Sequence, residues 1–283
     1  MQRLWLIVVA IILILVMGIG AYYYVLTLSE TNTTSTTSTT QSIAISRALA
    51  YLISSYNSKV GLIPETTGFG TYWVYSDNYL AVLALRQAGF SNSSLTSIAD
   101  NISATIQFYA PRLGDATNQY MALGDGWSGP CVFGSAQSYV VAQWSSIQIN
   151  VTLNNATGTL SASDYADTAF LTAICHQHQG DHALALNDFN LGAKFFDNTG
   201  FADQQFTGPG SINPGQYQTY KLALYVYASK LLSQPVNQAA LTTLLKMQAP
   251  DGGFYTGYYP GLTHGNTYTN TETTSLAILA LSN

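Results

Sequence analysis

Carboxylate and aromatic side chains occur together in several glycine-rich segments of the sequence. Gly124-Asp125-Gly126-Trp127, Gly200-Phe201-Ala202-Asp203 and Asp251-Gly252-Gly253-Phe254 are three of these segments. Two carboxyl groups beside aromatic rings suit sugar chemistry. One acid protonates the glycosidic oxygen, the second acts as base or nucleophile, and the rings stack on the pyranose face. These segments therefore predict glycan binding or glycan processing if the fold brings them together.

Helical hairpins are the elements that must position these segments. Ala- and Leu-rich helices with polar first turns are predicted over residues 76–85, 164–174, 216–227 and 270–281, and Leu80, Leu222 and Leu276 align between them. Amphipathic helices alternate with them, at residues 43–56, 94–109, 182–196 and 236–247. Their apolar residues recur at helical spacing. In such a repeat, each unit buries its apolar face against its neighbours.

One repeat unit carries a family resemblance. Gln248-Ala249-Pro250-Asp251-Gly252-Gly253-Phe254 is similar to the Q-x-x-x-G-x-W/F repeat of squalene-cyclase-like proteins. Together with the hairpin pattern, it makes the chain resemble the α/α-toroid superfamily, which includes terpene cyclases, protein prenyltransferase β subunits and six-hairpin glycosidases. The resemblance implies a mainly α fold, a shortened toroid of four to five helical hairpins, over residues 42–283. Prenyl chemistry is not expected, because the D-x-D-D motif is absent and Asp125 and Cys131 do not match the zinc-ligand spacing.

The resemblance also implies where a site would lie, at the N-terminal ends of the inner helices and beneath the preceding loops. Glu65, Asp125 and His264 lie in these loops and are the candidate catalytic residues. The candidate substrate-binding residues share a carboxyl group or an aromatic ring in or beside the same loops. They are Trp73, Tyr75, Asp77, Trp127, Asp203, Phe254, Tyr258 and Glu272.

Several of these acids also have a structural interpretation. Asp77, Asp167 and Glu272 fall in predicted first helical turns, where a carboxylate interacts favourably with the helix dipole and with free N–H groups. Asp251 precedes two glycines, a common turn arrangement. For Asp77, Asp167 and Asp251 the structural role is the favoured prediction.

Cys175, His178 and His182 have the i, i+3, i+7 spacing of ligands on one helix face. The repeat, however, predicts that this helix ends at Gly180 and that His182 begins the next one. Histidines near a helix C-terminus are also favoured by its dipole. The structural interpretation is favoured, and we predict neither a metal ion nor a cofactor.

Residues 111–163 depart from the helical repeat. Ile147, Ile149, Val151 and Leu153 alternate with polar residues, and Asn150 falls on the opposite face. This alternation is typical of a half-buried strand. We expect a small β insertion at about residues 137–158.

The N-terminal region predicts a membrane anchor. Residues 4–28 are apolar and uncharged, long enough to cross a bilayer. Arg3 precedes the run and the next cation is Arg47, so the N-terminus is expected in the cytoplasm and the rest outside. Residues 1–28 are therefore a predicted transmembrane signal-anchor, with the lipid bilayer as its partner. Cleavage near residues 18–21 is the alternative. Residues 29–41, rich in Ser and Thr, predict a stalk.

Composition agrees with a cell-surface location. Glycosylation sequons begin at Asn32, Asn92, Asn101, Asn150 and Asn155. The net charge of −5 without basic clusters excludes nucleic acid as a partner. Only 8% of residues are charged, which fits an acidic habitat or secretion alone. Cys131 and Cys175 are the only cysteines, and whether they pair depends on geometry.

We therefore expect a membrane-anchored cell-surface domain that binds or processes glycans, as a hydrolase or a lyase. The alternative is a non-catalytic cell-envelope module, with a structural or docking role towards surface-layer proteins. Two acids in an open cleft would favour the enzyme. If Tyr and Trp side chains filled the expected site and the acids capped helices, the non-catalytic module would be favoured.

Overall fold

The structure is a computed structural model of the 283-residue chain. It describes residues 38–67, 72–89, 92–109, 118–124, 127, 129–145, 147–208, 211, 213–265 and 267–282. Within these ranges, no helix has the length and apolar character needed to span a membrane. The predicted span at residues 4–28 lies outside them, as does the predicted stalk up to residue 37. Residues 38–41, predicted as the end of the stalk, are helical instead.

The chain divides into two units, Met1–Ile43 and Ala44–Asn283. The second unit is mainly helical, as expected, and its helices match the predicted ones to within a few residues. The Ala- and Leu-rich helices are α2 (Tyr75–Ala88), α4 (Ala166–His178), α7 (Thr219–Leu231) and α9 (Thr271–Ser282). The amphipathic helices are the helix at residues 38–55, α3 (Ser93–Tyr109), α5 (His182–Ala193) and α8 (Gln238–Lys246). Two short helices, η2 (Gln119–Leu123) and α6 (Gln204–Thr207), lie in the connections.

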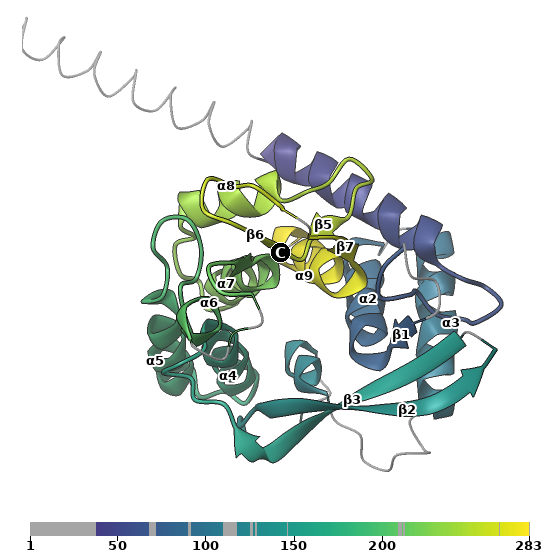
Figure 1. The fold of residues 1–283 in the computed structure, drawn as a ribbon, viewed down its shortest axis with the longest axis horizontal. Helices are drawn as coiled ribbons and strands as arrows, with labels where there is room; N and C mark the ends of the chain where they lie inside the picture. The colour runs from purple at the N-terminus through teal and green to yellow at the C-terminus, as the bar shows by residue number, and fades with distance from the viewer. Residues whose placement is uncertain are drawn as a thin grey trace, which may run out of the picture. The chain divides into compact units, whose positions relative to one another are not determined.

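The Ala- and Leu-rich helices lie side by side in the order α4, α7, α9, α2 (Figure 1). Alanines on facing surfaces, such as Ala81 and Ala84 of α2 and Ala277 of α9, are 0% exposed and allow close approach. The 3-10 helix η2 contacts both α4 and α2, the two ends of this row. The amphipathic helices α3, α5 and α8 pack against α2, α4 and α7 respectively.

A β hairpin occupies the stretch that departs from the helical repeat. Strands β2 (Gly134–Trp144) and β3 (Ile147–Thr159) pair antiparallel, and β1 (Tyr72–Val74) pairs parallel with β3. The predicted interval of 137–158 lies inside this hairpin. Short two-residue strands form two further pairs, β4 (Tyr217–Gln218) with β6 (Gly257–Tyr258) and β5 (Phe254–Tyr255) with β7 (Thr269–Asn270).

Three of the sequons fall on side chains that the structure describes. Asn92 and Asn101 are exposed, the first just before α3 and the second on it. Asn150 is only 3% exposed, and its side-chain oxygen accepts a hydrogen bond from Gln148. The expected exposed face of β3 is thus covered at this point, and Asn150 has no room for a glycan in the folded chain. Asn32 and the side chain of Asn155 lie outside the described part.

The boundary between α4 and α5 is where the sequence predicts it. Gly180 adopts a left-handed φ of 84°, and the Asp181 side chain accepts a hydrogen bond from the Leu184 N–H to begin α5 at His182. His182 is therefore not on the same helix as Cys175, and its Nδ1 lies 2.8 Å from Gln177 Oε1. Cys175, His178 and His182 therefore do not form a metal site on one helix face.

Cys131 and Cys175 form a disulfide, with Cα atoms 5.7 Å apart. The bond joins the segment before β2 to α4, across 44 residues of chain. Closing a loop of this length reduces the entropy of the unfolded chain. In the chain-entropy description, this stabilises the folded state by roughly 4 kcal/mol.

We expect reduction of this disulfide, or the double variant Cys131→Ser/Cys175→Ser, to lower the free energy of unfolding by about 2–4 kcal/mol. Denaturant unfolding with and without a reducing phosphine measures this at neutral pH. The double variant should be insensitive to the phosphine. An unchanged midpoint for the reduced wild type would contradict a stabilising role of the bond.

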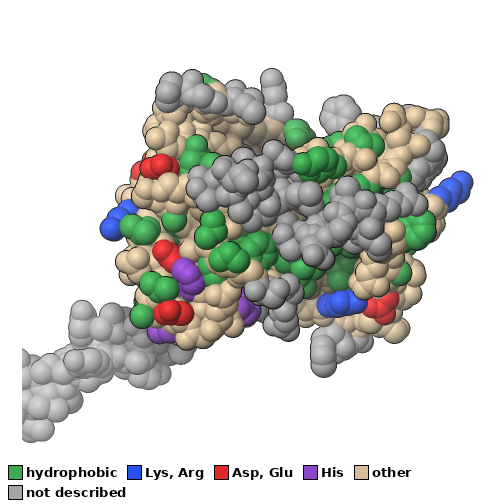
Figure 2. Space-filling model, turned by 90° about the horizontal axis from the view of Figure 1, so that it is seen from below, with side chains coloured by type: hydrophobic (Ala, Val, Ile, Leu, Met, Phe, Trp, Pro, Cys, Tyr) green, Lys and Arg blue, Asp and Glu red, His purple; other side chains and the backbone are tan. Residues whose placement is uncertain are grey.

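Charged side chains are sparse on the surface. On the face seen in Figure 2 they occur in ones and twos among polar and apolar side chains. Arg86 of α2 and Asp100 of α3 form an exposed ion pair, with a nitrogen–oxygen distance of 3.0 Å. Exposed pairs of this kind contribute little to stability.

Candidate acidic site at the helix N-termini

Three carboxyl groups converge where α2 and α9 begin. Asp77 lies in the first turn of α2, Glu272 in the first turn of α9, and Glu65 in the loop before β1. The start of α9 is fixed to that loop, because Thr271 donates its N–H to Glu65 O (2.9 Å) and its hydroxyl to Pro64 O (2.6 Å). The loop and the helix therefore hold Glu65 and Glu272 in one place.

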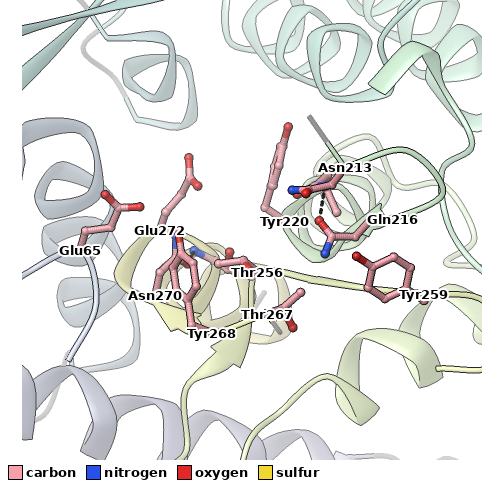
Figure 3. A pocket seen from close by; sticks show the side chains of 12 residues that line it. Glu65, Asn213, Gln216, Tyr220, Thr256, Tyr259, Thr267, Tyr268, Asn270 and Glu272 are labelled. Atoms are coloured by element: carbon pink, nitrogen blue, oxygen red, sulfur yellow. Dashed lines mark hydrogen bonds between the residues drawn. The ribbon is translucent and has the colours of Figure 1, made fainter. Parts of the chain in front are cut away.

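Two cavities share Glu65 and Glu272 as wall residues. The first, of about 380 Å³, lies towards α7 and the loops after it. Its other walls are mainly amides and hydroxyls, among them Asn213, Gln216, Gln218, Tyr220, Tyr268 and Asn270. In Figure 3, Glu65, Glu272 and Tyr220 rise from different segments towards the same side of this pocket. The second cavity, of about 280 Å³, lies towards η2 and β1 and includes Asp77, Asn118 and Tyr120.

The carboxyl groups hold their protons more tightly than usual. Burial raises the pKa of Glu272 to about 7, and the charges of Glu65 and Asp167 add to this, although the hydrogen bond from Tyr120 acts in the opposite direction. Burial, then the charges of Glu272 and Glu65, raises the pKa of Asp77 well above its usual value. Burial also raises the pKa of Glu65. Burial and mutual repulsion thus favour the neutral forms of these acids.

Two tyrosines donate hydrogen bonds to acids of this region. The Tyr120 hydroxyl, on η2, donates to Glu272, and the Tyr220 hydroxyl, on α7, donates to Asp167 Oδ2 at 2.8 Å. Burial and the neighbouring acids raise the pKa of both phenols well above 10, so both remain donors. Each tyrosine joins the end of one helix to an acid of another.

The predicted turn position of Asp251 is confirmed by its hydrogen bonds. Asp251 accepts hydrogen bonds from Gly253 N and Thr269 Oγ1, each at 3.0 Å. Asp77 and Asp167 lie in the first turns of α2 and α4, as the structural interpretation predicts, although the residue before each helix makes no side-chain capping bond. Asn78 anchors the loop instead, bonding the N–H and the C=O of Ile63.

Asp203, predicted to bind substrate, is part of the scaffold. It is 1% exposed, and it accepts hydrogen bonds from the N–H groups of Ala166 and Gln205. Its Oδ2 also lies 2.5 Å from Nζ of Lys221, a lysine that is itself 1% exposed. The ammonium group is 3.7 Å from Asp167 Oδ1 as well. This buried ion pair lies directly behind the acids that line the cavities.

Most of the aromatic rings predicted to stack on sugar lie in the core. Trp73, Phe254 and Tyr258 are at most 1% exposed and Tyr75 is 9% exposed. Phe254 and Tyr258 also anchor loops, through Phe254 N to Thr274 Oγ1 and Tyr258 Oη to Thr199 O. These rings are therefore removed from the set of substrate-binding candidates.

The remaining candidates lie elsewhere. Trp127 borders a separate cavity of about 220 Å³ beside His178 and the disulfide, and its indole N–H donates to Pro130 O. His264 stacks on Tyr255 with ring centroids 3.9 Å apart, and neither acidic cavity includes it. Asp125 lies outside the described residues. Of the three catalytic candidates, Glu65 alone is placed in the site.

The position of Tyr220 within its helix is a signal that the sequence analysis did not use. Asp167, Tyr220 and Glu272 each occupy the second residue of their helix, at the same level of the site. The leucine four residues later is buried in each case, at Leu171, Leu224 and Leu276. The sequence alignment used Leu222 instead of Leu224, a shift of two residues, which hid the equivalence of Tyr220 with the two acids.

Comparisons with protein-family models, with curated proteins and with solved structures give no match to this chain. The geometry and chemistry of the acidic site therefore carry the functional argument.

Proposed function

We propose that this chain is a cell-surface domain that binds glycans at the acidic site and hydrolyses a glycosidic bond there. The observation that carries the proposal is Glu272, an acid with a pKa of about 7, sharing a cavity wall with Glu65 among amides and hydroxyls. A general acid is most effective when its pKa is near the working pH. Amides, tyrosines and threonines are suitable partners for sugar hydroxyls.

The proposal extends to the architecture and the location. A shortened α/α toroid is supported by the row of α4, α7, α9 and α2, with η2 between its ends and the amphipathic helices outside. An anchor at residues 4–28 with an extracytoplasmic C-terminal domain is supported by the apolar run, by Arg3 and by the Ser/Thr-rich segment. The exposed sequons Asn92 and Asn101 agree with this orientation.

In the proposed reaction, protonated Glu272 gives its proton to the glycosidic oxygen. The bond from that oxygen to the anomeric carbon breaks, and its electron pair stays on the leaving sugar. A water oxygen bonds to the anomeric carbon and loses a proton to the carboxylate of Glu65. Glu65 suits this role because, unlike Glu272 and Asp77, its pKa is raised without the charge of a neighbouring acid.

Hydrolysis is favoured over elimination from acidic sugars. Elimination acts on uronates, and a cation beside the carboxylate of the sugar best stabilises the charge that develops there. The described residues that line the two cavities include no Lys, Arg or His.

The test compares the full chain in detergent with three variants on a polysaccharide panel, measuring new reducing ends. Glu272→Gln is expected to lower the rate by about 10²–10⁴-fold, the range for loss of a general acid, and Glu65→Gln by a similar factor. Asp100→Asn removes a carboxylate on the exposed face of α3 and should leave the rate unchanged. Equal activity of wild type and Glu272→Gln on a hydrolysed glycan would remove this assignment.

A non-catalytic docking module is the second candidate. It is favoured by the hydrogen bonds from Tyr120 and Tyr220, which already occupy oxygens of Glu272 and Asp167. If it holds, the panel yields no products from wild type, while glycan or surface-layer protein binds equally to wild type and Glu272→Gln.

A further inference from the structure

A third cavity continues the row of the two acidic ones. It has a volume of about 490 Å³ and lies at the start of α4, beside α6, with Tyr165, Asp167 and Gln205 in its walls. It shares Asn213, Gln218 and Tyr220 with the first cavity, just as the first shares Glu65 and Glu272 with the second. The order is therefore the cavity at η2 and β1, the central cavity, and the cavity at α4 and α6. Glu65 and Glu272 stand between the first two in this order.

We infer that the three cavities are subsites of one cleft, which binds an uncharged linear glycan of several sugar units and places an internal bond at Glu65 and Glu272. This inference rests on the proposed function and adds to it the class of substrate and the position of cleavage. Sugar units occupy the cleft on both sides of the acids, so the cut falls within the chain and not at its end.

Buried polar atoms without a partner indicate where the ligand is held. Asn118 is 1% exposed, and its Nδ2 has no hydrogen-bond acceptor, although it borders the cavity at η2. Thr273 is also 1% exposed, and its Oγ1 has no partner, at the wall of the central cavity. Polar groups buried this deeply are normally satisfied. A hydroxyl group of a bound sugar supplies the missing partner in each cavity.

The charges of the cleft select an uncharged chain. Among the described residues that line the three cavities, four are carboxylic acids, Glu65, Asp77, Asp167 and Glu272, and none is a Lys, Arg or His. Lys221, whose ammonium group lies 3.7 Å from Asp167, is buried and paired with Asp203. A uronate or sulfate group would therefore lie beside carboxyl groups with no compensating cation.

Aromatic rings are available for each sugar unit, although they differ from the predicted ones. Tyr72 borders the cavity at η2, Tyr268 the central cavity, and Tyr165 the cavity at α4. Tyr268 is 48% exposed, so its face is open to a ligand. Rings at intervals along a cleft are a means of holding consecutive pyranose units.

The test uses the full chain carrying Glu272→Gln, which binds without cleaving, and calorimetric titration with neutral oligosaccharides of one to six units. Malto-, cello-, manno- and chito-oligosaccharides are the probes, with oligogalacturonides as the anionic comparison. For the series that binds, affinity should rise at least tenfold between two and five units. Galacturonides of equal length should bind at least tenfold more weakly than that series.

Second-site variants separate the subsites. In the Glu272→Gln background, Asn118→Ala in one outer cavity and Gln205→Ala in the other should each lower the affinity for the longest ligand about tenfold. At least one of the two variants should leave the affinity for the disaccharide within twofold, because two sugar units cannot occupy all three cavities. Asp100→Asn serves as the control, and circular dichroism verifies the folding of every variant.

The outcomes distinguish the inference from the proposed function. A disaccharide that binds as tightly as a hexamer, or hydrolysis that releases only terminal units, overturns the extended cleft and leaves hydrolysis standing. Equal binding of galacturonides overturns the charge selection. No binding of any sugar, together with no hydrolysis by wild type, overturns the proposed function itself.

Discussion

Glu272→Gln is expected to raise the free energy of unfolding at pH 8 by about 2–3 kcal/mol, in addition to the loss of hydrolysis proposed above. The folded protein raises the pKa of Glu272 from 4.5 to about 7. The folded state therefore binds more protons than the unfolded state between these values, and stability is lost as pH rises through them. One pKa unit corresponds to about 1.4 kcal/mol. The energy obtained from the whole pKa shift is reduced here, because the Glu272 side chain is partly exposed to solvent. Glutamine is neutral at every pH and avoids this loss.

Denaturant unfolding at intervals from pH 4 to pH 8 measures the effect. The wild-type free energy of unfolding should fall between about pH 4.5 and pH 7, and that of Glu272→Gln should fall less. The unfolding free energy of Glu272→Gln should still fall somewhat with pH, because the pKa values of Asp77 and Glu65 are also raised in the folded protein. The control Asp100→Asn should follow the wild type. Parallel curves for wild type and Glu272→Gln would show that Glu272 titrates normally in the folded protein.

The direction of this dependence bears on the habitat. A protein whose buried acids keep their protons is most stable in acid, where the unfolded chain is protonated too. The low content of charged residues, 8%, agrees with such a setting, because ion pairs weaken when carboxylates are protonated. Catalysis and stability would then share an acidic optimum.

Lys221→Met is expected to lower the free energy of unfolding by about 3–5 kcal/mol, the usual result of leaving a buried charge unpaired. Asp203 is 1% exposed and would lose its contact with the ammonium group at 2.5 Å. It would keep the hydrogen bonds from Ala166 N and Gln205 N, which hold the start of α4 and α6. The acidic cleft should be disturbed too, because Lys221 approaches Asp167.

The double variant Lys221→Met/Asp203→Asn separates the charge from the packing. Asparagine removes the unpaired charge and keeps one acceptor oxygen, so part of the lost stability should return. Lys246→Met, an exposed lysine at the end of α8, should change stability by less than about 0.5 kcal/mol. If Lys221→Met matched Lys246→Met in thermal and denaturant unfolding, the buried pair would contribute nothing.

The helices were largely predictable from the sequence, because their patterns are local. Apolar spacing located the amphipathic helices, and Gly180 and His182 marked the end of α4 and the start of α5. Alternation at Ile149 and Val151 located the hairpin. Propensity and period act over a few residues and are visible without a fold.

The site was less predictable, because it depends on which side of a loop each ring faces. Trp73 and Phe254 occur beside acids in the sequence, yet they fill the core, while tyrosines such as Tyr268 face the cleft. Tyr120 and Asn118 come from an irregular segment whose pattern carries no period. Tyr220 could have been predicted, because an alignment on the helix starts matches it with Asp167 and Glu272.

The contacts that complete the acidic site join distant parts of the chain. Tyr120 and Glu272 are 152 residues apart, and the bond from Thr271 to Pro64 spans 207 residues. Closing such long loops makes folding slow, because the chain loses entropy before the contacts form. No short fragment or early folding intermediate can assemble the cleft. Activity and the native state should therefore appear at the same rate during refolding, with no active species preceding the folded protein.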